Sequence, residues 1–121
     1  MIYKNTIINI ADNSGPKKAK ALNIKKKKIG YIGDILVVSI KKKSNIKKNL
    51  KKNILNSIIL ASKKKKKRLD GSFIRFKYNK VAILDDKLIF FGTNLRSLIC
   101  KEIKKNQKNH IKLISFSKGI I

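Results

Sequence analysis

The most strand-like stretch of this chain is Ile35-Leu36-Val37-Val38-Ser39-Ile40, which follows directly on the turn residues Gly33 and Asp34. A short run of aliphatic and β-branched side chains bounded by a turn signal predicts a β-strand. Its apolar character is continuous rather than alternating, so we expect burial on both faces of this strand. The stretch therefore indicates a domain that is mainly β.

Similar short patterns lie on both sides of this stretch. Strands are predicted at residues 6–10, 18–24, 54–60, 73–76 and 81–84. Turn chemistry of Asp, Asn, Ser, Gly and Pro separates them at residues 11–16, 70–72 and 85–86. Many short strands with recurring turn signals are typical of a small antiparallel barrel and not of a helical bundle.

The pattern changes toward the C-terminus. Leu95, Leu98, Ile99 and Ile103 recur at helical spacing and predict one face of a short helix. Residues 111–116 are apolar and compatible with either a strand or a helix. We expect a single domain over residues 1–121, with the barrel at about 1–92 and short C-terminal helices at about 93–121.

Composition limits the class of protein. Hydrophobic residues make up 42% of the 121 positions, which is too many for a disordered basic tail and enough for one core. Cys100 is the only cysteine, so an internal disulfide and a cluster of thiolate ligands are excluded. No apolar run reaches the roughly 18 residues of a membrane span, and the first residues lack the pattern of a targeting peptide. We therefore expect no membrane partner and synthesis in the compartment where the protein works.

The charge balance points to a polyanionic partner. Lys and Arg number 32 against six acidic residues, for a formal net charge of +26. A small domain ordinarily carries a net charge of magnitude about 2–8, and a large excess of one sign opposes compaction. Only three of the basic residues are Arg, which favours contact with phosphates over bidentate recognition of bases. The expected partner is nucleic acid, recognised by shape and backbone.

Basic residues concentrate in runs between the predicted strands. A lysine-dense arm at residues 41–52 is expected to project as a ribbon or loop, and a second run covers residues 63–68. Each lysine that meets a phosphate releases condensed counterions. The residues expected to bind RNA are Lys17, Lys18, Lys26, Lys27, Lys28, Lys42, Lys43, Lys47, Lys48, Lys51, Lys52, Lys63, Lys64, Lys65, Lys66, Lys67, Arg68 and Arg75.

Support for catalysis is weak in this sequence. Asp85 and Asp86 are adjacent but lack the His or third acid that a metal site would need, so a turn is the better interpretation. The acid nearest to His110 is Glu102, eight positions away, so a nucleophile and base pair of Cys100 with His110 lacks an orienting group. We expect no enzymatic activity, no cofactor and no metal, and we interpret Cys100 as a small core residue.

Aromatic residues near the second lysine run have two possible roles. Phe73 and Phe76 lie on either side of Arg75, and Tyr78 follows. Aromatic side chains stack bases in an RNA-binding sheet, but they fill the core of a small barrel. We expect Phe76 in the core and leave Tyr78 open between the two roles.

Two segments resemble the universal large-subunit ribosomal protein L-fourteen. They are Ile8-Asn9-Ile10-Ala11-Asp12-Asn13-Ser14-Gly15 and Arg68-Leu69-Asp70-Gly71-Ser72-Phe73-Ile74-Arg75-Phe76, the latter followed by Asn79 and Ala82-Ile83-Leu84. Gly30, Gly33-Asp34-Ile35, Gly92-Thr93, Lys101-Glu102 and residues 111–115 also match, so the resemblance covers essentially the whole chain. The chain departs from the usual family pattern at Leu69, Asn94 and Ser97-Leu98.

This resemblance implies a five-stranded antiparallel β-barrel with a projecting basic ribbon and short C-terminal helices. It implies a structural constituent of the large ribosomal subunit that binds large-subunit rRNA and contributes to the intersubunit face. The implied partners are neighbouring large-subunit proteins, small-subunit rRNA at an intersubunit bridge, and a ribosome-silencing factor that docks on Thr93, Asn94 and Lys112. The alternative from another class is a free, non-specific nucleic-acid-condensing protein, which would use the same lysines.

Residue usage bears on the source of the chain. It contains 22 Ile, 29 Lys and 12 Asn, the amino acids whose codons are richest in A and T. Such a bias indicates a shrunken genome. We expect the ribosome of a reduced organelle, an apicoplast-like relict plastid, with the cytoplasm of a reduced-genome bacterium as the alternative.

Overall fold

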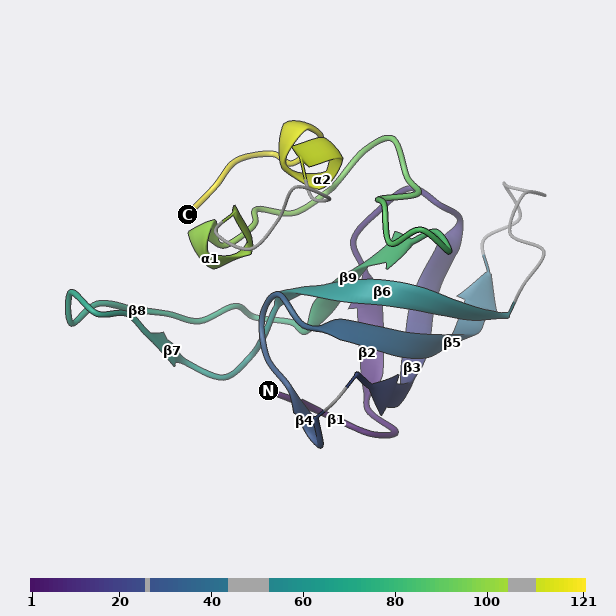
Figure 1. Ribbon diagram of the computed structural model, residues 1–121, viewed down its shortest axis with the longest axis horizontal. Helices are drawn as coiled ribbons and strands as arrows, with labels where there is room; N and C mark the ends of the chain where they lie inside the picture. Colours follow the sequence, from purple (N-terminus) through teal and green to yellow (C-terminus); the bar gives the residue numbers. More distant parts are fainter. Residues whose placement is uncertain (26, 44–52, 105–110) are drawn as a thin grey trace.

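Five strands close into a barrel in the order β2-β3-β5-β6-β9, in a computed structural model that describes residues 1–25, 27–43, 53–104 and 111–121 (Figure 1). The barrel strands are β2 (Ile7–Ile10), β3 (Pro16–Ile24), β5 (Ile35–Lys43), β6 (Ile54–Ala61) and β9 (Lys80–Leu84). Neighbouring strands pair antiparallel, except that β2 pairs with β9 in parallel and so closes the ring. The predicted barrel is confirmed, with this one parallel pair as a refinement.

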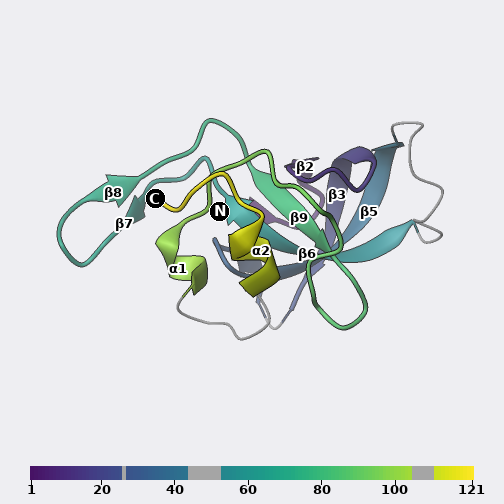
Figure 2. The same ribbon diagram turned by 90° about the horizontal axis from the view of Figure 1, so that it is seen from above.

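Smaller elements surround the barrel. Strand β1 (Ile2–Tyr3) pairs with β4 (Ile29–Gly30), and β7 (Lys66–Lys67) pairs with β8 (Phe73–Ile74). The β7–β8 hairpin projects away from the barrel (Figure 1). Helices α1 (Lys101–Lys104) and α2 (Ile111–Ser115) lie on the side of the barrel from which the hairpin leaves (Figure 1 and Figure 2). The projecting basic ribbon and the short C-terminal helices are therefore confirmed.

Two clusters of buried side chains form the core. Every barrel strand contributes to the interior cluster, which includes Ile8, Ala19, Leu36, Val38, Ile59, Val81 and Ile83. The alternate residues of β6 and β9 point outward into a second cluster, which comprises Ile58, Leu60, Ala82 and Leu84 together with Ala11, Phe90, Leu95, Ile99, Ile103 and Leu113. Strand β9 and the second half of β6 are thus covered on both faces, which explains the continuous apolar sequences at residues 58–61 and 81–84.

Strand β5 is covered less completely than we expected from its sequence. Leu36 and Val38 are fully buried inside the barrel, whereas Ile35, Val37 and Ile40 are only partly buried. The reason is that the C-terminal segment packs on β6 and β9 and meets β5 at Ile35, which contacts the second cluster. The prediction of a strand at residues 35–40 is confirmed. Burial on both faces is found in β9 and the second half of β6 rather than in β5.

The helix predicted from Leu95 to Ile103 is wrong over most of its length. Only Lys101–Lys104 is helical, and before it the chain is extended, with exposed Leu98 between buried Ser97 and Ile99. Backbone hydrogen bonds hold this segment against the C-terminus, including Ile121 N to Ile99 O at 2.9 Å. Apolar positions at 95, 99 and 103 satisfy both a helical and an extended pattern, so spacing alone could not choose. The second C-terminal segment, left open between strand and helix, is helical in α2.

The lysine-dense arm expected at residues 41–52 is described only in part. Strand β5 continues through Lys43, three residues beyond the predicted strand end, and residues 44–52 of the expected arm lie outside the described residues. The projecting β7–β8 hairpin carries the end of the second lysine run, and only Phe73–Ile74 of the strand predicted at 73–76 is formed. Lysine-rich sequence therefore does not prevent pairing where a partner strand is available.

Replacing Ile58 by Ala should destabilise the protein strongly. Ile58 is fully buried beneath the C-terminal segment, so the change removes apolar contacts and leaves a cavity, at a cost of about 2–5 kcal/mol. Ile54→Ala on the same strand is the matched control, because Ile54 is 58% exposed and its loss should cost within about 0.5 kcal/mol. Denaturant unfolding of both variants measures the difference. Equal destabilisation would contradict the burial of the outer face of β6.

Candidate nucleic-acid interface

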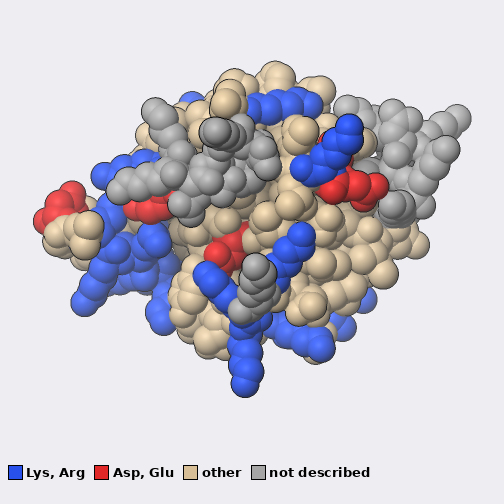
Figure 3. All heavy atoms as spheres, in the orientation of Figure 1, with Lys and Arg blue, Asp and Glu red and all other residues tan. Residues whose placement is uncertain are grey.

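The residues expected to bind RNA lie mainly on exposed surface. Exposed among them are Lys17, Lys18, Lys27, Lys28, Lys63, Lys64, Lys65, Lys67 and Arg75, whereas Lys66 and Arg68 are partly buried. Lys42 and Lys43 belong to β5, and Lys26, Lys47, Lys48, Lys51 and Lys52 lie outside the described residues. In Figure 3 the Lys and Arg side chains gather below the hairpin and along the lower edge of the barrel. This face is the candidate nucleic-acid interface.

The turn of the hairpin is held by its own side chains. Asp70 Oδ1 accepts hydrogen bonds from Ser72 Oγ at 2.6 Å and from Ser72 N at 3.0 Å, and these bonds lower the pKa of the Asp70 carboxyl. Gly71 adopts a φ of 87°, a conformation that costs glycine little. Arg68 N donates to Ser72 O at 2.8 Å across the turn. The lysines of the hairpin are therefore presented on a preformed support, which reduces the ordering cost of binding.

Arg68 differs from the lysines that precede it, because its guanidinium is engaged within the chain. Its Nε donates to Glu102 Oε1 at 2.8 Å, and its Nη2 donates to the backbone oxygen of Ile121 at 2.7 Å. The hydrogen bond to Glu102 raises the pKa of Arg68. Burial alone would raise the pKa of the Glu102 carboxyl, but the hydrogen bond from Arg68, a backbone hydrogen bond and the charges of Arg68 and Lys66 together outweigh it and hold that pKa below its ordinary value. Arg68 thus anchors the hairpin to α1 and to the C-terminal residue, a long-range contact that no local pattern predicts.

Removing the Glu102 carboxylate should make stability less dependent on pH in acid. The pKa of Glu102 is lower in the folded than in the unfolded state, so the contact stabilises the protein above the unfolded value and is lost as pH falls through the folded value. Wild type should lose more stability than Glu102→Gln between about pH 5 and pH 2, measured by denaturant unfolding. Arg68→Gln should remove the same pH-dependent stabilisation. The double variant should lose no more of it than either single variant. Identical pH profiles for all four proteins would exclude the contact.

Aromatic residues near the hairpin lie largely at the surface. Phe73 is 59% exposed and Tyr78 is 44% exposed. Phe76 is only partly buried and belongs to neither core cluster, so its predicted place in the core is wrong. The chain leaves the barrel after β6 to form the hairpin, and Phe76 lies on the returning segment, where its N donates to Ser62 O at 3.1 Å. Tyr78 also lies outside the barrel interior.

The acidic residues hold turns and strand junctions. Asp34 Oδ2 accepts a hydrogen bond from Tyr31 N at 2.8 Å, and Asp85 Oδ1 accepts one from Ile89 N at 2.9 Å. Asp12 is buried, and its Oδ2 accepts a hydrogen bond from Ile83 N at 2.8 Å across to β9. The turn interpretation of these aspartates is confirmed. Within the described ranges no three His, Cys, Asp or Glu side chains come together to hold a metal, and His110 lies outside those ranges.

Cys100 should react slowly with thiol reagents in the folded protein. It is fully buried, as predicted for a core residue, and burial, followed by the charge of Glu102, raises the pKa of its thiol to about 11. Since the thiolate is the reactive form, alkylation at pH 8 should be at least about 100-fold slower in the native than in the denatured protein. Mass spectrometry of a time course with iodoacetamide measures both rates. Equal rates in the native and denatured protein would show that the Cys100 thiol is accessible to iodoacetamide in the fold.

Asn13 holds the surface expected to meet a protein partner. Its Oδ1 accepts hydrogen bonds from Thr93 N at 3.0 Å and Asn94 N at 3.2 Å, and its Nδ2 donates to Thr93 Oγ1 at 2.7 Å. Thr93, Asn94 and Lys112 are exposed, and a backbone hydrogen bond of 3.3 Å joins the chain after Asn94 to the chain after α2. The sequence places Asn13 in a predicted turn and indicates no long-range partner. An Asn side chain readily accepts hydrogen bonds from nearby backbone N–H groups, which is the local signal for a turn. The partners of Asn13 lie 80 and 81 positions away, so no local pattern predicts them.

Fold and site together define a small, strongly basic β-barrel protein with a projecting lysine-rich hairpin. Neither helix in the described part of the chain has the length and apolarity needed to cross a membrane. The family model described as Ribosomal protein L14p/L23e matches residues 1–121. The chain belongs to this family, which confirms the resemblance carried by the two motif segments. The family is structural and non-enzymatic, and membership supports a place in the large ribosomal subunit.

Proposed function

We propose that this chain binds large-subunit rRNA through the face that carries the β7–β8 hairpin, as a structural component without enzymatic activity. The observation that carries the proposal is the hairpin itself, whose turn is held by Asp70 and Ser72, with exposed Lys67 on β7 and exposed lysines at 63–65 leading into it. A rigid basic projection suits folded RNA, whose shape and phosphates are its main recognition features. Asp70 is the acid within the hairpin, and it is already satisfied by Ser72.

A free protein that condenses nucleic acid without specificity is the alternative. It would use the same lysines but would need no fixed arrangement of them, so the preformed hairpin and the family membership favour the ribosomal role. Purified from its source, the protein should co-sediment with large subunits and bind folded large-subunit rRNA more tightly than duplex DNA of equal length. Recovery only in ribosome-free fractions, with equal affinity for DNA, would favour the condensing protein.

Contacts beyond the rRNA follow from the family likeness. We propose that neighbouring large-subunit proteins and small-subunit rRNA meet this chain at the intersubunit face, where it takes part in a bridge. Thr93 and Asn94, fixed by Asn13, and Lys112 on α2 support a docking surface for a ribosome-silencing factor. Truncation of Lys112 to Ala should weaken that docking without changing the sedimentation of the protein with large subunits.

The proposed setting is the ribosome of a reduced organelle, with a relict plastid favoured over a reduced-genome bacterium. Support comes from the 22 Ile, 29 Lys and 12 Asn of the chain, which indicate a genome rich in A and T. Mapping the gene to organellar, nuclear or bacterial DNA tests this assignment. A nuclear gene with a transit peptide upstream would overturn it.

Replacing Lys63, Lys65 and Lys67 by Gln should flatten the salt dependence of rRNA binding. All three are exposed, and each phosphate they neutralise adds about 0.7–0.9 to the slope of log affinity against log salt, so the triple variant should lose up to about 2–3 units. The charge-matched control replaces Lys87, Lys112 and Lys118, which are exposed and lie outside residues 63–74. Filter binding across a salt series measures both slopes. Equal flattening in the two triple variants would mean that only net charge matters.

A further inference from the structure

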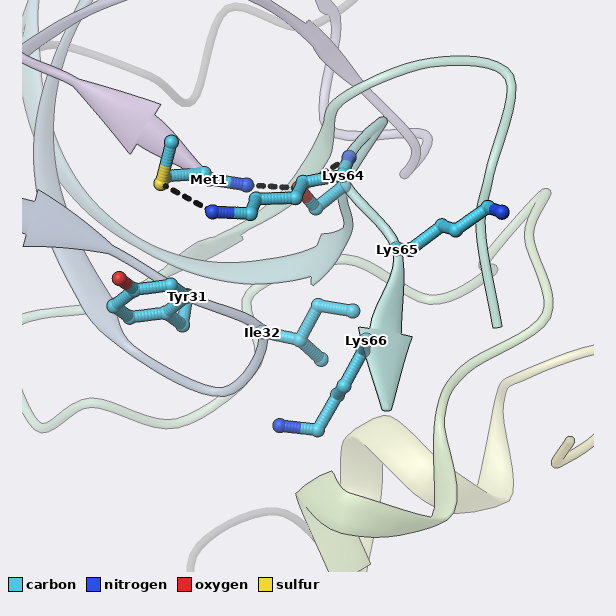
Figure 4. Close-up of a pocket in the computed structure, with 7 residues that line it drawn as sticks. Met1, Tyr31, Ile32, Lys64, Lys65 and Lys66 are labelled. Atoms are coloured by element: carbon cyan, nitrogen blue, oxygen red, sulfur yellow. Dashed lines mark hydrogen bonds between the residues drawn. The ribbon is translucent and has the colours of Figure 1, made fainter. Parts of the chain in front are cut away.

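A cavity of about 210 Å³ opens between the loop before β5 and the first residues of the hairpin (Figure 4). Its walls include Tyr31 and Ile32 from the loop, Met1 at the N-terminus, and Ser62, Lys64, Lys65 and Lys66 from the segment that leads into β7 and begins it. Among the described residues that line it, none is acidic. The cavity therefore combines an aromatic and aliphatic wall with uncompensated positive charge.

The three lysine side chains that line the cavity take two directions (Figure 4). Nζ of Lys65 lies 4.3 Å from the ring centroid of Phe73, and its side chain points away from Tyr31 in Figure 4. The side chains of Lys64 and Lys66 run in the opposite direction, toward the side on which Tyr31 lies. Two ammonium groups thus flank the aromatic wall, although the sequence offers no means to tell these lysines apart.

Tyr31 presents an exposed ring on a supported backbone. The side chain is 45% exposed, while its backbone N–H donates to Asp34 Oδ2 at 2.8 Å and the following residue, Ile32, packs against both core clusters. On the facing wall, Ser62 Oγ accepts a hydrogen bond from the amino group of Met1. Both walls are held by contacts within the chain, so the cavity is preformed.

We propose that this cavity receives one unstacked base of a single-stranded RNA segment, stacked on the ring of Tyr31, with the adjoining phosphates on Lys64 and Lys66. Aromatic side chains flanked by basic residues are the common means of holding splayed-out bases of RNA. The volume is below the roughly 300–1,000 Å³ of sites that enclose whole small molecules. It therefore suits a single base, with sugar and phosphates left at the mouth beside the lysines.

The assignment deepens the proposed function and rests on it, because it names the RNA feature that the hairpin face would meet. Phosphate contacts alone would leave binding indifferent to unpaired bases. A base in the cavity would fix the register of one RNA strand against the hairpin. A free mononucleotide also carries a base and a phosphate. The test therefore compares a mononucleotide with a base in an RNA strand.

The experiment uses the full chain and three probes: a short single-stranded RNA, an abasic oligomer with the same number of phosphates, and a mononucleotide. Wild type should bind the base-bearing strand more tightly than the abasic one. Tyr31→Ala should lose at least about fivefold in affinity for the base-bearing strand, the stacking contribution of one base, and little for the abasic strand. Tyr31→Phe keeps the ring and should retain wild-type affinity.

Two controls separate stacking in the cavity from general effects. Tyr78→Ala removes an equally exposed ring that also has a lysine beside it, with Lys77 Nζ 5.4 Å from its centroid, but that lies outside the cavity, and it should leave affinity unchanged. Replacing Lys64 and Lys66 by Gln should lower the salt slope by up to about 1.4 units for a single strand, whereas Tyr31→Ala should leave the slope unchanged. Circular dichroism of each variant verifies that it is folded.

Three results would overturn the proposal. They are an unchanged affinity in Tyr31→Ala, an equal loss in Tyr78→Ala, and a mononucleotide that binds as tightly as the strand. Binding of folded large-subunit rRNA is measured with the same preparations. If wild type binds that rRNA while single-strand affinity is independent of Tyr31, the cavity assignment alone fails. If single-strand binding depends on Tyr31 but folded rRNA is not preferred over duplex DNA, the proposed function alone fails.

Discussion

The parallel pairing of β2 with β9 closes the barrel, and the other features of the structure depend on this closure. Strand β2 has only four residues, and contacts beyond its end reinforce the pairing. Ala11 N donates to Val81 O at 2.9 Å, and the buried carboxylate of Asp12 accepts from Ile83 N at 2.8 Å. Ala11 O in turn accepts from Arg96 N at 2.9 Å, so the C-terminal segment uses the same junction. Closure pairs the edges that an open sheet would expose.

Charge and core occupy separate parts of the molecule, which is how a chain of net charge +26 can remain compact. Apolar burial is concentrated on β6 and β9, where the C-terminal segment covers the barrel. The exposed lysines lie on the hairpin, on the loops and on barrel strands such as β3. Two of the six acids hold a basic segment to the domain. Asp34 pairs with Lys27 at 3.1 Å beside β4, and Glu102 pairs with Arg68 at the base of the hairpin.

The hairpin turns a low-complexity run into residues with different roles. Arg68 is used for anchoring, Lys65 covers Phe73, and Lys64 and Lys66 face the side of Tyr31. These differences arise because successive residues of an extended chain point to opposite sides, and because the barrel places different neighbours on each side. An identical run on a free tail would present equivalent charges.

The sequence by itself determined the β class, the positions of the barrel strands and the turns, because strand periodicity and Asx or glycine turn chemistry are local properties. It also determined the polyanionic character of the partner through net charge, and the two motif segments carried the family. Only the tertiary structure decided that residues 95–100 are extended rather than helical, since their hydrogen-bond partners lie at the C-terminus. It likewise decided that Phe76 lies outside the core, that Arg68 is engaged by Glu102, and that Tyr31 borders a basic cavity. Each of these depends on contacts between residues far apart in the chain, which periodicity and composition do not encode.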